Sequence, residues 1–134
     1  KGVESMQYRR KESFRFTFDT PQSAIVQLRV NEANRLSYTC DLIDISARGA
    51  RLFSPIRLDE YTADVIVEMV VTFFKKELVI PGEIVWKRPS KDGTLFGMHF
   101  SHDKKQEQNI ISELKFKRHK ELEEEFRLKG KRLY

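Results

Sequence analysis

The chain has 134 residues and a formal net charge of +5, from 25 Lys and Arg against 20 Asp and Glu. This length suits a single domain, and a hydrophobic content of 40% can supply its core. Six glycines, four prolines and one cysteine exclude a collagen-like or largely disordered chain, an internal disulfide and a zinc site built from several thiolates.

The basic charge is concentrated at the two ends of the chain. Residues 1–15 hold five basic and two acidic side chains, and residues 115–134 hold eight and four. The segment between them holds twelve basic and fourteen acidic side chains and is mildly negative. A continuous basic face, as needed for a nucleic-acid polymer, is therefore not expected, and a small anionic ligand fits better.

No apolar run is long enough to span a bilayer, which takes about 20 residues. The most apolar run, Val65–Phe74, is interrupted by Glu68, and the first residues contain no apolar signal region. A soluble cytoplasmic protein without membrane insertion is the expectation.

From Phe14 to Phe100 the chain alternates between apolar and polar side chains in the manner of β-strands. The first alternation covers Phe14–Phe18, and a second follows over Ala24–Val30 after a turn predicted at Thr20–Pro21. Asp92–Gly93 predicts a tight hairpin, and Pro81–Gly82 predicts a bulge or an edge position. Further strands are expected over Leu36–Ile45, Gly49–Phe53, Val65–Phe74, Glu77–Lys87 and Thr94–Phe100. The spacing is typical of a mainly β fold, a small barrel or sandwich of six or seven antiparallel strands.

A C-terminal α-helix is predicted after Asp103, which can act as its N-cap with Gln106 completing a capping box. Apolar residues recur there at helical spacing: Ile110, Ile111, Leu114, Leu122 and Phe126. The first half should pack on the barrel, and the second should be solvated because it is rich in Glu and Lys. A coiled-coil seam is disfavoured because its heptads are not sustained. We therefore expect a flexible basic arm over residues 1–13, a β-barrel over 14–102 and a helix over 103–129.

Basic residues cluster just before the first strand, at Arg9, Arg10, Lys11 and Arg15. A solvated arm would explain them. A guanidinium group also matches phosphate oxygens or the O6/N7 edge of guanine, and it can stack on a purine. The arm is therefore a candidate anion clamp.

A second motif, Asp44-Ile45-Ser46-Ala47-Arg48-Gly49, stands at the exit of a predicted strand. An ordinary turn can have the same pattern, with Asp and Ser side chains hydrogen-bonded to nearby backbone amides and a glycine after them. As a binding element, Asp44 could accept from a guanine N–H edge and Ser46 could reach a base or phosphate. Gly49 would let the backbone approach the ligand closely.

The order of these motifs resembles the PilZ domain. The resemblance covers about Arg9–Phe100 and includes Gly82–Trp86 and Phe96–Phe100. PilZ domains are six-stranded β-barrels, often with a trailing helix, that bind the bacterial second messenger cyclic di-GMP and have no catalytic activity. The resemblance thus implies a signal-transduction receptor with no cofactor other than this ligand, and a downstream protein partner. It implies a binding site formed by Arg9, Arg10, Lys11, Arg15, Asp44, Ser46, Arg48 and Gly49.

The basic arm departs from the family pattern, which reads Arg-x-x-x-Arg. Four residues before Arg15 stands Lys11, with Arg10 one place further upstream. Lysine cannot provide a bidentate fork to guanine. A bulge in the arm could bring Arg10 to the position of the first arginine in this pattern, or Lys11 could contact the ligand there with lower affinity. A third possibility is that the pocket has lost the ability to bind the nucleotide. Two alternatives follow: a PilZ-like protein-interaction module that no longer binds the nucleotide, and a small RNA-binding barrel with exposed aromatic residues.

Other reactive side chains form no convincing site in the sequence. His99 and His102 lack a third metal ligand at usable spacing and are expected at the surface. Cys40 paired with a histidine lacks a third orienting group, so neither an enzyme nor a metal site is predicted. Trp86 and the cluster of phenylalanines are expected in the core.

Overall fold

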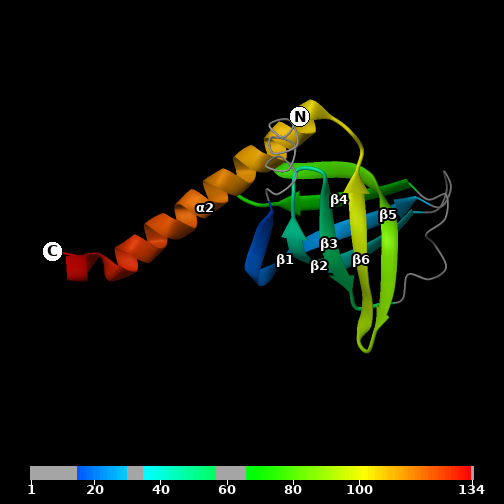
Figure 1. Cartoon of the computed structure of the whole chain (residues 1–134), viewed down its shortest axis with the longest axis horizontal. Coiled ribbons are helices and arrows are strands. Elements are labelled where there is room, and N and C mark those ends of the chain that lie inside the picture. The colour runs from blue at the N-terminus through cyan, green and yellow to red at the C-terminus, as the bar shows by residue number, and fades with distance from the viewer. Residues whose placement is uncertain (1–14, 30–34, 57–65, 134) are drawn as a thin grey trace, which may run out of the picture.

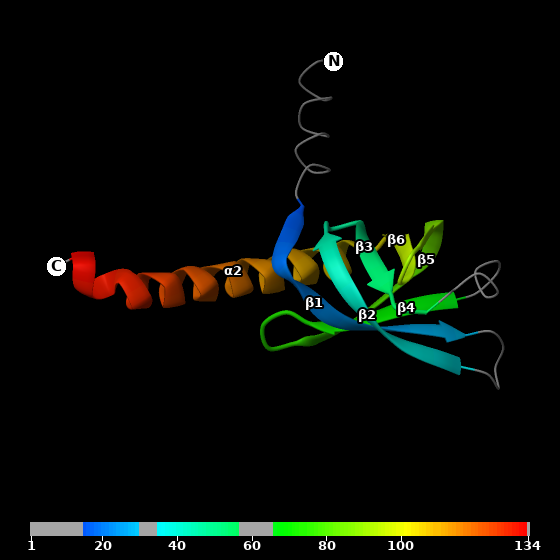
Figure 2. The ribbon, with the colours of Figure 1, turned by 90° about the horizontal axis from the view of Figure 1, so that it is seen from below.

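The computed structural model describes residues 15–29, 35–56 and 66–133. Within these ranges six antiparallel strands close into a barrel in the order β1-β2-β3-β6-β5-β4, and helix α2 follows (Figures 1 and 2). The elements are β1 (Phe16–Arg29), β2 (Arg35–Ile45), β3 (Gly49–Ser54), β4 (Ile66–Thr72), β5 (Glu77–Ser90), β6 (Gly93–Phe100) and α2 (Lys104–Leu133). The predicted six-stranded antiparallel barrel with a C-terminal helix is confirmed.

The turn predicted at Thr20–Pro21 is wrong, because β1 runs through it as one strand. The pairing of β1 with β2 is irregular between Thr17 and Gln22, and the strand continues in regular register after Gln22. Pro21 lies within this irregularity. Proline has no N–H to donate, so a break in the ladder accommodates it without the loss of a hydrogen bond.

Alternate strand residues fill the barrel, and the most deeply buried include Leu28, Leu42, Leu52, Met69, Ile80 and Phe96. Cys40 belongs to the same core and is 1% exposed. Burial raises the pKa of the Cys40 thiol to about 12. The thiol therefore stays protonated at neutral pH, which makes it a poor nucleophile.

Strand β5 changes neighbours at Gly82, which is in register with Val67 of β4 and with Phe100 of β6. A Cβ atom on Gly82 would lie 2.3 Å from the His99 carbonyl oxygen, so glycine is needed at this close approach. The register shift itself falls later, between Ile84 and Trp86. The bulge predicted at Pro81–Gly82 is therefore displaced to Val85.

The predicted hairpin joins β5 to β6, and Ser90 pairs with Gly93 across it. Its two-residue loop is Lys91–Asp92, one position earlier than predicted, and Gly93 opens β6. A Cβ atom on Gly93 would lie 2.0 Å from the Ser54 carbonyl oxygen. Close packing against the end of β3 thus explains this glycine.

Helix α2 begins as predicted, since the backbone N–H groups of Lys105 and Gln106 donate to Asp103 Oδ1 at 3.0 and 3.2 Å. The second half of the predicted capping box is wrong. The Gln106 side chain donates instead to the Val79 carbonyl oxygen at 2.7 Å. It thereby ties the first turn of α2 to β5.

The two halves of α2 have different surroundings. Ile110 and Leu114 are 0% and 1% exposed and complete the barrel core, whereas Leu122 and Phe126 are 39% and 62% exposed. The second half extends past the end of the barrel (Figures 1 and 2). The expected division into a packed and a solvated half is confirmed. Among the described residues, no helix has the length and apolar character needed to cross a membrane.

Candidate ligand-binding site

The site is centred on Asp44, which lies near the end of β2 and is 3% exposed. Arg15 Nη1 lies 2.6 Å from Asp44 Oδ1, and Arg51 Nη2 lies 2.8 Å from Asp44 Oδ2. Strand register brings the groups together, since Asp44 pairs with Thr17 of β1 on one side and with Arg51 of β3 on the other. Both carboxylate oxygens are therefore engaged by arginines.

These two arginines are half-exposed, at 49% for the Arg15 side chain and 47% for that of Arg51. A buried carboxylate requires charge partners or hydrogen bonds, and here its partners sit at the surface. Water can solvate either guanidinium group when it leaves, whereas the buried carboxylate then needs a replacement donor. The Asp44 carboxylate is thus a buried acceptor, and a ligand could replace its arginine donors.

A surface cavity of about 400 Å³ opens beside this cluster. It is lined by Arg15, Asp44, Gly49, Ala50, Arg51, Val85, Trp86, Gly97, Met98 and His99. Its volume lies in the range of sites that bind small molecules, about 300–1,000 Å³. Cationic, anionic and aromatic groups thus face one space large enough for a small molecule.

The expectation that Trp86 is in the core is wrong, because its side chain is 40% exposed at this cavity. Strand alternation places Trp86 on the same face as Ile84, but the register shift between them turns it outward. The indole lies against Gly97, where an added Cβ atom would come within 2.1 Å of Trp86 Nε1. The Arg88 guanidinium lies 5.9 Å from the ring centroid.

The turn after β2 is held by its own hydrogen bonds. The Ser46 N–H donates to the Gly49 carbonyl oxygen at 2.8 Å, and the Arg48 N–H donates to Ser46 Oγ at 3.3 Å. Ser46 Oγ also donates to the Gly49 carbonyl oxygen at 3.3 Å, and the residue is 7% exposed. Ser46 therefore shapes the turn, while Gly49 lines the cavity.

Arg48 points elsewhere, since its Nε lies 4.0 Å from Glu107 Oε2 on α2 and it does not line the cavity. The structure thus brings together Arg15, Asp44 and Gly49, and leaves Arg48 beside the helix. The remaining predicted residues, Arg9, Arg10 and Lys11, lie outside the described residues and stay predictions.

The sequence reasoning missed Arg51, and it did not place Trp86 at a site. Arg51 looks like an ordinary solvent-facing residue of a strand, and only the register across β2 and β3 pairs it with Asp44. The glycine opposite Trp86 was a usable signal, because Gly97 leaves room for an indole on the barrel surface.

The histidines do not form a metal site in the described part of the chain, where no three His, Cys, Asp or Glu side chains are grouped suitably. His99 is exposed and lines the cavity. His102 Nδ1 lies 3.4 Å from Glu107 Oε2.

The family model described as the PilZ domain matches residues 8–117. This range covers most of the chain, including the barrel and the half of α2 that packs on it. The chain therefore belongs to the PilZ domain family. No curated protein sequence matches it.

Proposed function

We propose that this chain is a non-catalytic receptor for cyclic di-GMP and that the cavity beside Asp44 binds the nucleotide. Membership of a family of cyclic di-GMP receptors supports the ligand class. The observation that carries the proposal is the buried Asp44 carboxylate, held by two half-exposed arginines at a cavity that also exposes Trp86.

The ligand offers groups that complement this set. Guanine presents N–H donors at N1 and N2, which a carboxylate can accept, and acceptors at O6 and N7, which match an arginine fork. The two phosphate groups of cyclic di-GMP carry one negative charge each. Asp44 is the acceptor for a guanine N–H edge, and Arg15 and Arg51 are the donors for phosphate or the opposite base edge.

Binding then proceeds as an exchange of partners at Asp44. Each Asp44 oxygen contacts one arginine and keeps a second lone pair, so the geometry allows a guanine edge either to use that lone pair or to displace a guanidinium group, and we propose the displacement. The displaced arginine keeps a charge partner if it turns to a ligand phosphate. The exchange replaces one set of charged contacts by another, which limits the desolvation cost.

The Trp86 indole is the surface on which the face of a guanine base of the ligand stacks. Stacking of a base on an aromatic side chain contributes about 1–3 kcal/mol. The indole is already held against Gly97, so little side-chain freedom is lost when a base stacks on it.

Isothermal titration with cyclic di-GMP tests the proposal. Arg15→Ala should weaken binding at least about tenfold, because a charge-assisted contact is worth about 1.5–3 kcal/mol. Arg35→Ala is the matched control, since Arg35 is an exposed arginine at the opposite end of β2 from Asp44. The absence of binding heat in the parent chain would favour the alternative of a protein-interaction module. Equal affinities of Arg15→Ala and Arg35→Ala would reject the proposed site.

The upstream clamp is tested in the same titration with variants of the arm. If Lys11 fills the first arginine place of the family pattern, Lys11→Arg should tighten binding several-fold by adding a bidentate fork. If Arg10 fills it, Arg10→Ala should weaken binding and Lys11→Ala should have little effect.

A further inference from the structure

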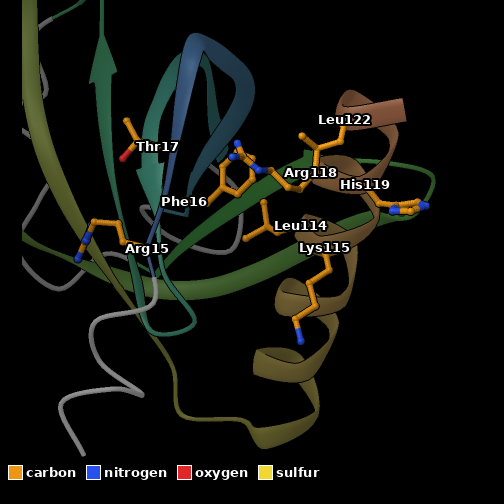
Figure 3. Close-up of a pocket in the computed structure, with 8 residues that line it drawn as sticks. All are labelled: Arg15, Phe16, Thr17, Leu114, Lys115, Arg118, His119 and Leu122. Atoms are coloured by element: carbon orange, nitrogen blue, oxygen red, sulfur yellow. The ribbon is translucent and has the colours of Figure 1, made fainter. Parts of the chain in front are cut away.

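A second cavity, of about 460 Å³, lies between the start of β1 and the side of α2 (Figure 3). It is lined by Arg15, Phe16, Thr17, Leu114, Lys115, Arg118, His119 and Leu122. Figure 3 shows Arg15 turned away from the helix, in keeping with its ion pair to Asp44. The floor of this groove is therefore apolar, with Phe16 and Leu114, and its rim on α2 is basic.

Two cations of the rim, Lys115 and Arg118, are not neutralised by a direct ion pair in the described part of the chain, although Arg118 lines a neighbouring cavity with Asp19 and Glu121. By contrast, Lys117 Nζ lies 3.1 Å from Glu121 Oε2. His119 Nε2 lies 3.5 Å from Glu123 Oε2. An apolar floor with an unneutralised basic rim is suited to an acidic segment that carries a large apolar side chain.

The chain contains such a segment on the same helix. Residues 121–125 hold four glutamates, and Phe126 follows them with 62% of its surface exposed. Lys115, Leu122 and Phe126 are spaced by seven and four residues, so Phe126 lies on the helix face that borders the groove. That face continues past the barrel, where the barrel no longer covers it (Figure 2).

We propose that two copies of this chain associate through α2 in antiparallel orientation. Phe126 of each copy enters the groove of the other above Leu114, and the glutamates beside Phe126 face Lys115 and Arg118. The two-fold axis then passes between Arg118 and Leu122 of the two copies, and every contact occurs twice, as in an isologous interface. The contact is a side chain seated in a groove, which does not require the sustained heptads of a coiled coil.

A second copy is the occupant that the charge pattern favours. The stretch Lys115–Lys120 is basic and the following stretch Glu121–Glu125 is acidic. Antiparallel pairing about their junction sets the basic stretch of each copy against the acidic stretch of the other. Parallel pairing in register would set like charges against each other.

Sedimentation equilibrium of the full chain without ligand tests the proposal, because this mass does not depend on molecular shape. The mass should approach twice 15.9 kDa as the concentration rises to about 100 µM. Phe126→Glu should return it to one chain. Leu128→Glu is the matched control: Leu128 is 82% exposed, lies on another face of α2, and should leave the dimer unchanged.

Charge exchange supplies an independent test. The variant Lys115→Glu/Arg118→Glu and the variant Glu123→Lys/Glu125→Lys should each associate at least about tenfold more weakly than the parent. An equimolar mixture of the two should recover the dimer mass, and far-UV circular dichroism should show an unchanged helix content in each. A parent that stays monomeric, a dimer that survives Phe126→Glu, or a mixture that stays monomeric would each overturn the proposal.

Discussion

Two carboxylates, Asp44 and Glu113, are buried to a similar extent but have different kinds of partner. Asp44 is 3% exposed and pairs with two arginine side chains at a cavity. Glu113 is 4% exposed, and its Oε1 accepts from the backbone N–H groups of Lys75 and Lys76 at 3.1 and 3.0 Å. Burial is nearly the same, but one set of partners consists of half-exposed side chains and the other is part of the backbone.

The nature of the partners separates a recognition group from a structural one. Backbone amides of the β4–β5 connection cannot leave Glu113 without rearranging the chain, so this carboxylate fastens α2 to the barrel. Half-exposed arginines can leave Asp44 and return. A buried acid whose donors are exchangeable is therefore the better candidate for reading a ligand.

The largest expected effect is on ligand affinity in Asp44→Asn. This change keeps the volume and removes the charge, so affinity for cyclic di-GMP should fall about 10- to 100-fold in a calorimetric titration. The free energy of unfolding in urea should fall by only about 1 kcal/mol, because the Asn oxygen can still accept a hydrogen bond and both arginines can be hydrated. A larger loss of stability would mean that Asp44, like Glu113, is structural.

Glu113→Ala should give the reverse pattern. Two charge-assisted hydrogen bonds to backbone amides are lost, so the free energy of unfolding should fall by about 3 kcal/mol or more. Affinity for the nucleotide should be unchanged, because Glu113 does not line the cavity. Glu124→Ala, at an exposed position of α2, is the control and should alter neither quantity. Reduced affinity in Glu113→Ala would break the distinction between the two acids.

Cys40 is a third buried ionisable group, and unlike Asp44 it has no positively charged partner. Its thiol has a pKa of about 12 in the fold against 9.0 as the reference value, so above pH 9 the unfolded chain loses this proton while the folded chain keeps it. Stability should therefore fall as pH rises, by about 1 kcal/mol between pH 9 and pH 10 from this group. The parent should show this extra slope relative to Cys40→Ala in urea unfolding; parallel profiles would contradict it.

The smallest expected effect concerns the aromatic wall of the cavity. In Gly97→Ala the new methyl group would displace the Trp86 indole, since its carbon would lie 2.1 Å from Nε1. Nucleotide affinity should fall about three- to tenfold, within the contribution of one stacked base. The emission maximum of Trp86 should shift, and the far-UV circular dichroism should not. Unchanged affinity would show that the ligand does not use this wall.

Local patterns in the sequence predicted most of the fold. Strand alternation predicted the barrel strands, Asp103 predicted the start of α2, and the Glu and Lys content of its second half predicted which half is solvated. The errors arise where the backbone departs from regular alternation. The irregularity after Thr17 carries β1 through a predicted turn, and the register shift at Val85 brings Trp86 to the surface.

The candidate site was predicted less completely, because its geometry depends on contacts between strands. Asp44 and Gly49 follow from a local motif, and both line the cavity. Arg51 becomes a partner of Asp44 only through the register of β2 and β3, which no local pattern reveals. Arg48 was grouped with the site by its place in the motif, yet its side chain lies toward α2.

The central claim is that cyclic di-GMP binds between Asp44 and Trp86. Trp86 is the only tryptophan in the chain, so its fluorescence reports on the cavity without interference from another indole. The account predicts a saturable change in Trp86 emission when the parent chain is titrated with cyclic di-GMP, and a shift of that curve to at least about tenfold higher concentration in Asp44→Asn. Saturable binding that leaves the emission unchanged, or identical curves for the two proteins, would contradict it.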